Sequence, residues 1–194
     1  MSSLLFLDIE IVKLDEFDPS DYEMHRSENA NFDFGAETNK VICVSVCSSK
    51  EDFVPRSIVG DEVAILSETM KLINDHTTII GYNIQAFDLP FLARRSVINS
   101  LPICQSLKAY DKKPWDANYI VDLYLIWKHW SQKACTLDIL CRALNLPTPK
   151  ENMNGSQVDD YFRAGRIAEI ASYCEADVKA TVQVYKRFKS TNLI

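Results

Sequence analysis

The chain has 194 residues, 47% of them hydrophobic and 25% charged, a balance typical of one folded globular domain spanning residues 1–194. No apolar stretch reaches the ~18–20 residues of a membrane-spanning helix, and the N-terminus lacks the basic start of a signal peptide. The formal net charge of −6 argues against binding nucleic acid through a broadly basic surface.

Four apolar or β-branched runs in the first half of the chain predict strands, at residues 4–9, 41–46, 53–59 and 77–82. Pro55 places the third of these at an edge of the sheet, because proline has no N–H to donate to a neighbouring strand. The acidic segment 15–39 predicts a long loop, of a length that is more often functional or disordered than incidental. Apolar residues at helical spacing after a capping Asp61 predict a helix over residues 61–75.

Helices dominate the second half of the chain, where we expect them at residues 88–97, 136–144 and 167–188. Residues 119–127 predict a strand that passes into a helix around Asp122. Strands followed by helices favour an α/β fold, in which a mixed sheet of about five strands is flanked by helices.

The remaining composition predicts a cytoplasmic protein with little basic surface. Six cysteines occur without a CxxC pair or a cysteine–histidine pattern with zinc spacing, so we expect reduced, mostly buried thiols. Basic residues form only local patches, at residues 94–95, 112–113 and 186–189, and we interpret each patch as solvated surface charge.

Two acids interrupt the first predicted strand. Residues two apart in a strand project to the same side about 6.5–7 Å apart, so Asp8 and Glu10 point together. Leu7 and Ile9 then point into the opposite layer. Neighbouring carboxylates repel each other unless a cation lies between them, and hard oxygen ligands suit Mg²⁺ or Mn²⁺. The alternative is a strand end that emerges into solvent, since so short a motif is frequent by chance.

A tyrosine and an acid lie four residues apart in the last predicted helix. Tyr173 and Asp177 therefore share one helix face. The carboxylate would complete a metal site, and the phenol would orient the attacking water or accept its proton. The alternative is an aromatic core residue beside a surface acid.

More polar candidates follow the strand predicted at residues 77–82. Asp88 would either ligate a second metal ion or cap the helix that begins there. Asn83 would hydrogen-bond a sugar or a neighbouring ligand, and Phe87 would either stack on a base or pack in the core. Together the segments predict a two-metal site that cuts a nucleic acid from one end. Divalent ions would make this acidic cluster attractive to phosphate.

These segments also carry a family resemblance. FLDIE, GYNIQAFDLPFL and YCEADV resemble, in that order, the three motifs of the DEDD superfamily of 3′–5′ exonucleases. The spacing from Tyr173 to Asp177 is typical of its tyrosine-bearing branch. The sequence is similar to the proofreading exonuclease domain of family B DNA polymerases, in its stand-alone predicted bacterial form, over almost the whole chain.

The resemblance implies a ribonuclease H-like fold with a mixed sheet and helices on both sides. It implies that Asp8, Glu10, Asp88 and Asp177 are the four metal-binding acids and that Tyr173 is the catalytic tyrosine.

The resemblance also implies substrate contacts. Asn83 and Phe87 match positions that hold the 3′-terminal nucleotides, and Lys150 is our candidate for a lysine that the family B domains use between the second and third motifs.

We therefore expect a 3′–5′ exonuclease that hydrolyses single-stranded nucleic acid, DNA in preference, to nucleoside 5′-monophosphates. One Mg²⁺ or Mn²⁺ ion would lie at Asp8, Glu10 and Asp177, and a second near Asp8 and Asp88. A polymerase or another basic partner would tether the enzyme to its strand. Two alternatives stay open: an exoribonuclease, and a ribonuclease H-like module that binds nucleic acid or a protein partner without cutting.

Overall fold

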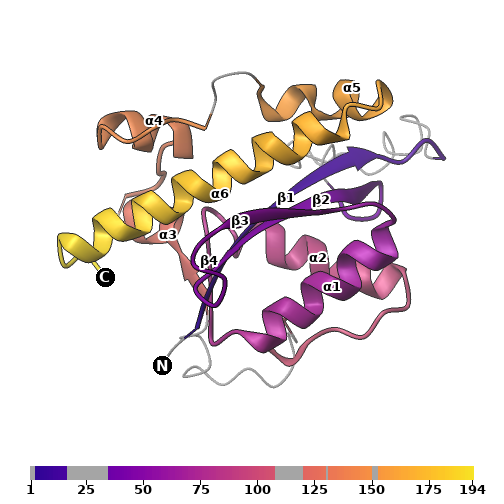
Figure 1. Cartoon of the computed structure of the whole chain (residues 1–194), viewed down its shortest axis with the longest axis horizontal. Coiled ribbons are helices and arrows are strands. Elements are labelled where there is room, and N and C mark those ends of the chain that lie inside the picture. The colour runs from indigo at the N-terminus through magenta and orange to yellow at the C-terminus, as the bar shows by residue number, and fades with distance from the viewer. Residues whose placement is uncertain (1–2, 17–34, 108–119, 130, 150–152) are drawn as a thin grey trace.

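The computed structural model describes residues 3–16, 35–107, 120–129, 131–149 and 153–194 (Figure 1). In this part of the chain, five strands form a mixed sheet in the order β3-β2-β1-β4-β5. The central strand β1 pairs antiparallel with β2 and parallel with β4. The strands are β1 (Leu4–Lys13), β2 (Asn39–Ser48), β3 (Pro55–Val59), β4 (Thr78–Gly81) and β5 (Ile120–Asp122).

Helices cover both faces of the sheet, as Figure 1 shows: α1 and α2 lie on one side and α6 crosses the other. The short helices α3, α4 and α5 pack against α6. The helices are α1 (Glu62–Asp75), α2 (Asp88–Ile98), α3 (Leu123–Lys128), α4 (Leu137–Ala143), α5 (Val158–Arg163) and α6 (Ile167–Ser190). The predicted α/β class, with a mixed sheet of about five strands between helices, is confirmed.

The strand β1 is longer than predicted. It runs over 10 residues, because its pairing with β2 continues past a register shift between Glu10 and Ile11 as far as Lys13. The two acids therefore lie within a strand, and the interpretation of a strand end emerging into solvent was wrong. At the end of the predicted 15–39 loop, β2 already begins at Asn39, while residues 17–34 lie outside the described residues.

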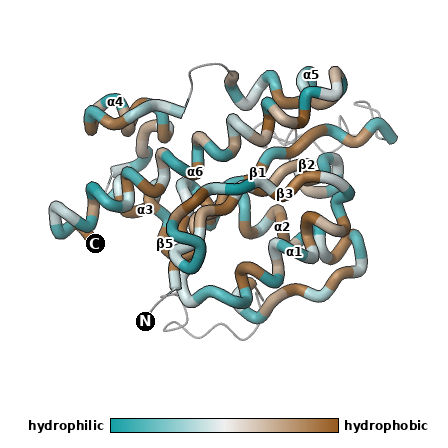
Figure 2. The backbone as a smooth tube through the Cα atoms, viewed as in Figure 1, coloured by the Kyte–Doolittle hydropathy of each residue, from teal (hydrophilic) through white to brown (hydrophobic). Residues whose placement is uncertain are grey.

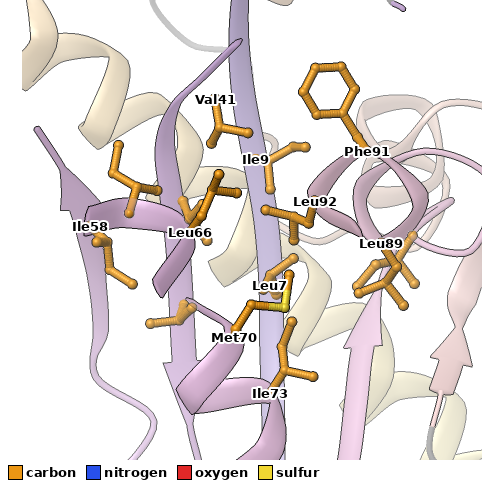
Figure 3. Close-up of a cluster of buried hydrophobic side chains, with 14 of the residues drawn as sticks. Leu7, Ile9, Val41, Ile58, Leu66, Met70, Ile73, Leu89, Phe91 and Leu92 are labelled. Carbon is orange, nitrogen blue, oxygen red and sulfur yellow. The ribbon is translucent and has the colours of Figure 1, made fainter. Parts of the chain in front are cut away.

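Alternation along β1 divides its side chains between two layers. Leu7 and Ile9 point toward α1 and α2, where they meet side chains such as Leu66 and Leu92 (Figure 3). Hydrophobic residues recur along the strands and helices in Figure 2. A slip of one residue would turn the two apolar side chains away from this layer and bury the acids in it. Burying a Leu or Ile side chain stabilises the fold by about 1.5–3 kcal/mol, so the register of β1 is strongly specified.

One predicted basic surface patch is partly buried. Arg95 is only 5% exposed and donates to both oxygens of Glu62, over 2.8 and 2.6 Å. It also donates to the carbonyl oxygen of Ala36, while Glu62 accepts from the backbone of Val41. The interpretation of Arg95 as solvated charge was therefore wrong. This ion pair joins α1 and α2 to the start of β2.

Candidate active site

The acids of β1 face helix α6. Opposite them on β2 lie Ser45, paired with Asp8, and Cys43, paired with Glu10. From α6, the thiol of Cys174 donates to the backbone oxygen of Asp8 over 3.5 Å and to its carboxylate over 3.4 Å. Oxygen atoms of Asp8 and Glu10 and the sulfur of Cys174 all lie within 4.8 Å of one another. The pattern of β1 predicted the two acids, but Cys174 had been interpreted only as a buried thiol.

Asp88 reaches the same strand from α2. It is the first residue of that helix, is 4% exposed, and accepts a hydrogen bond from the backbone N–H of Ile9 over 3.2 Å. The N-cap position belongs to Phe87, whose side chain makes no capping bond. The interpretation of Asp88 as a helix cap was therefore wrong, and its carboxylate instead ties α2 to β1.

A tight turn between β4 and α2 aims Asp88 at the sheet. A side chain on Gly81 would place its Cβ 2.6 Å from the Cβ of Ile84, so this close approach requires glycine. Asn83 has a φ of +65°, in the left-handed region that asparagine tolerates better than most residues. The carbonyl of Asn83 accepts from the N–H groups of Ala86 and Phe87. The turn thus closes on itself immediately before the helix.

Tyr173 and Asp177 reach the cluster from α6. Asp177 lies one helical turn beyond Tyr173, and its charge acts on the Tyr173 hydroxyl. Burial first, and then the charges of Asp177, Glu10 and Asp8, raise the pKa of Tyr173 well above its usual value. A hollow of about 240 Å³ opens beside this tyrosine, and Tyr161, Met153 and Ser172 contribute to its lining. The phenol is therefore a persistent hydrogen-bond donor at the edge of a hollow.

The acids perturb one another strongly. Burial is the main cause that raises the pKa of Asp8 well above its usual value, followed by the charges of Asp177, Asp88 and Glu10. Burial and the charges of Asp177, Cys43 and Asp88 raise the pKa of Glu10 in the same direction. Mutual repulsion of converging carboxylates is the electrostatic setting that a divalent cation relieves, and their oxygens suit Mg²⁺ or Mn²⁺. The residues present therefore fit a metal site.

The structure brings five of the predicted residues into electrostatic or hydrogen-bonding contact. They are Asp8, Glu10, Asp88, Tyr173 and Asp177. Asn83 lies in the turn that leads to Asp88, and the ring of Phe87 packs 5.7 Å from that of Phe91, at the margin of the core beneath α1 and α2. The predicted Lys150 lies outside the described residues.

Comparison with known families agrees with this geometry. A family model described as a predicted 3′–5′ exonuclease related to the exonuclease domain of PolB matches residues 34–192. The chain belongs to this exonuclease family. The residues that match the family model include Asp88, Tyr173 and Asp177. The match begins after β1, so Asp8 and Glu10 lie outside it, and it is the structure that brings them beside the other three residues.

Two DNA polymerases are similar to all or part of this chain. A DNA polymerase of Archaeoglobus fulgidus is 36% identical over 69 residues, which cover 34% of this chain and 9% of the polymerase. The structure of the family B DNA polymerase of Pyrobaculum calidifontis matches with a TM-score of 0.73 at 19% identity, over 100% of this chain and 25% of the polymerase. The chain thus spans a quarter or less of either polymerase. The structural match supports the ribonuclease H-like fold.

Among the residues that the structure describes, no helix of this protein is both long and apolar enough to cross a membrane.

The Asp88 carboxyl predicts an unusual dependence of stability on pH. Burial first, and to a smaller extent the charges of Asp122 and Asp177, raise the pKa of Asp88 to about 7, although its backbone hydrogen bonds oppose this. Between the usual aspartate pKa of about 4 and this value, the folded protein binds the proton more tightly than the unfolded chain. Its contribution to the unfolding free energy therefore falls as pH rises through this window.

Asp88→Asn keeps an acceptor for Ile9 N–H and removes the charge. We expect it to raise the Tm of the metal-free protein at pH 8 but to leave the Tm nearly unchanged near pH 4, measured by thermal melting in EDTA. Added Mn²⁺ should stabilise the wild type more than the variant. A variant that melts below the wild type at pH 8 in EDTA would show that the Asp88 charge is already well compensated.

Proposed function

We propose that this protein is a metal-dependent 3′–5′ exonuclease, which hydrolyses the terminal phosphodiester of single-stranded nucleic acid and releases nucleoside 5′-monophosphates. One observation carries the proposal: acids from β1, α2 and α6 converge beside the half-buried Tyr173 in a chain of an exonuclease family. Mutually repelling carboxylates are costly to a protein that only binds, which favours a catalytic site over a binding module.

Four acids would hold two divalent ions, Mg²⁺ or Mn²⁺. In this proposal Asp8, Glu10 and Asp177 hold one ion, and Asp8 with Asp88 holds the other. When bound, such ions neutralise charge on the phosphodiester and favour ionisation of the attacking water. The Cys174 thiol, a donor to Asp8, would keep that carboxylate oriented between the two positions.

Tyr173 would orient the attacking water. Without bound ions, burial and the neighbouring carboxylates raise the pKa of Tyr173, and an ordinary phenol pKa of about 10 already leaves the hydroxyl protonated at neutral pH. Its one O–H would therefore donate to the attacking water, which favours orientation over the role of a base. Asp177, one helical turn further on, would hold the neighbouring ion.

The substrate end would occupy the hollow beside Tyr173. Asn83, Phe87 and Lys150 are our candidates to contact the terminal nucleotides. Aromatic stacking accepts any base, as an enzyme that digests from an end requires. We favour DNA over RNA because the two similar proteins are DNA polymerases. We place the enzyme in the cytoplasm.

End-labelled oligonucleotides test the proposal most directly. Single-stranded DNA and RNA of one sequence, labelled at the 5′ end, are incubated with protein and Mn²⁺, Mg²⁺ or EDTA. We expect stepwise shortening with either metal, none with EDTA, and faster digestion of DNA. Faster digestion of RNA would indicate an exoribonuclease. Binding of both strands without cutting under any metal would indicate a binding module.

The acidic surface predicts weak dependence of binding on salt. Arg95 is buried against Glu62, and Arg163 and Arg166 are paired with acids on or next to their own helices. These three cations are already paired with acids, and the chain as a whole carries a net charge of −6. We expect the logarithm of the binding constant to fall with the logarithm of salt concentration as for about one to three released ions, compared with six to ten for a strong DNA binder.

Weak binding would make the enzyme distributive, unless a polymerase or another more basic partner tethers it. Excess substrate should then give a ladder of products. If some strands are digested completely while others stay intact, and if binding depends steeply on salt, the protein has a basic groove that binds nucleic acid.

A further inference from the structure

A buried acid outside the proposed metal site binds the turn that leads to Asp88. Asp122 ends β5, where it pairs with Gly81 of β4, and it is 2% exposed. Its Oδ1 accepts from the backbone N–H of Asn83 over 2.9 Å, and its Oδ2 accepts from that of Gln85 over 3.0 Å. These contacts join segments 37 and 39 residues apart in the sequence.

The same carboxylate also caps helix α3. It accepts from the N–H groups of Tyr124 and Leu125 over 3.0 and 3.3 Å, which is the ordinary work of an N-cap. Capping explains only two of its four hydrogen bonds. On helix α1, the exposed Asp61 provides the comparison, because its carboxylate caps its own helix by accepting from the N–H groups of Val63 and Ala64.

The two additional bonds hold a turn that contains a residue in the left-handed region of backbone dihedrals. Asn83 has left-handed dihedrals, and its carbonyl accepts from Phe87 N–H at the entrance of α2. The next residue is Asp88, which accepts from Ile9 N–H between the two acids of β1. A continuous series of bonds thus runs from Asp122 through the turn to the strand that carries Asp8 and Glu10.

We propose that Asp122 is a positioning residue of the nuclease site, which holds the turn over residues 83–87 so that Asn83 and Asp88 face the acids of β1. This inference rests on the proposed function for the roles of Asn83 and Asp88. Asp122 acts through the backbone of the turn and contacts neither substrate nor metal.

Asp122→Ser separates the two tasks of this carboxylate. Serine caps helices as well as aspartate does, but its single oxygen on a shorter side chain cannot also reach both Asn83 N–H and Gln85 N–H. Asp61→Ser is the matched control, because the Asp61 carboxylate caps helix α1 and is not bonded to the turn before Asp88. If Asp122→Ser fails to fold, Asp122→Asn is used, in which one acceptor oxygen becomes a donor and faces N–H groups.

The readouts are kcat and KM on single-stranded DNA, Mn²⁺ affinity by electron paramagnetic resonance, and Tm. Loss of residues that orient a metal site costs about ten- to hundredfold in activity or metal affinity. We expect a fall of that size in kcat and a weaker affinity for one Mn²⁺ ion in Asp122→Ser, while the protein remains folded at the assay temperature. Asp61→Ser should at most lower Tm, and it should leave kcat, KM and the Mn²⁺ affinity unchanged.

Two results would overturn the inference: wild-type kcat and Mn²⁺ affinity in the Asp122 variant, or equal losses in the Asp61 control. The Mn²⁺ measurement also separates this inference from the proposed function. If the wild type binds Mn²⁺ but cuts no oligonucleotide, the proposed function fails, and the change in Mn²⁺ affinity still decides whether Asp122 positions Asp88.

Discussion

Asp8→Asn is expected to abolish nuclease activity without weakening the fold. Asp8 is the acid whose pKa responds to all three other carboxylates, so it lies at the centre of the charge cluster. Losing several kcal/mol of transition-state charge stabilisation corresponds to at least about a thousandfold in rate. The amide keeps an oxygen that can accept from the Cys174 thiol and removes repulsion in the metal-free protein. Its Tm in EDTA at pH 8 should therefore equal or exceed that of the wild type.

Glu68→Gln is the matched control for this charge loss. Glu68 lies on α1, is exposed, and pairs with Arg56. Surface pairs of this kind contribute at most about 1 kcal/mol to stability, so this variant should retain full activity. Rates are measured on end-labelled single-stranded DNA with Mn²⁺ over a range of concentrations. Activity of Asp8→Asn close to that of the wild type would exclude Asp8 from the metal site.

Tyr173→Phe is expected to slow the reaction by about ten- to thousandfold, within the range of positioned hydrogen-bonding and acid–base groups. Only the hydroxyl is lost, so affinity for a single-stranded oligonucleotide should barely change. Because the pKa of Tyr173 is raised far above neutrality, the hydroxyl has no titration to lose. Between pH 6 and 9, kcat should therefore be lower at every pH by about the same factor, so that the shape of the pH profile is unchanged.

Tyr185→Phe removes a hydroxyl from the same helix, more than three turns further on. Its ring packs edge-on against Phe6, with 5.3 Å between ring centroids, and this contact needs no hydroxyl. It should leave the rate unchanged. If Tyr173→Phe instead binds the oligonucleotide more weakly at an unchanged rate, Tyr173 contacts the substrate and does not orient water. A lost basic limb in its pH profile would indicate a phenolate base.

The parts of the site that depend on the regular spacing of side chains along one strand or one helix could be predicted from the sequence. Alternation along β1 predicted that Asp8 and Glu10 project together, and the structure places them on the face toward α6. The spacing of four residues predicted that Tyr173 and Asp177 share a face, and the charge of Asp177 acts on the Tyr173 hydroxyl. The cap at Asp61 was also predicted, because an acid stands directly before an apolar helical run, and so was the change from strand to helix around Asp122.

Contacts between distant segments could not be predicted in this way. The links from Asp122 to Asn83 and from Cys174 to Asp8 span 39 and 166 residues and depend on the tertiary fold. Helix α5 was missed because six residues are too few to show a period. Its end does carry a local signal: Gly165 has a φ of +72°, and the N–H of Arg166 bonds back to Tyr161, as in many helix termini.

The site combines a part of the sheet that we expect to be well protected from hydrogen exchange with a part that we expect to be weakly protected. Strand β1 pairs with β2 over Leu5–Lys13 and with β4 over Leu4–Phe6, so we expect its hydrogen-bonded amide protons to exchange slowly with solvent. Strand β5 has three residues and lies at the edge, where local fraying is least costly. Fraying there would release Asp122 and the turn before Asp88, while Asp8 and Glu10 remain in place. The proposed catalytic site would then come apart and reassemble without global unfolding of the protein.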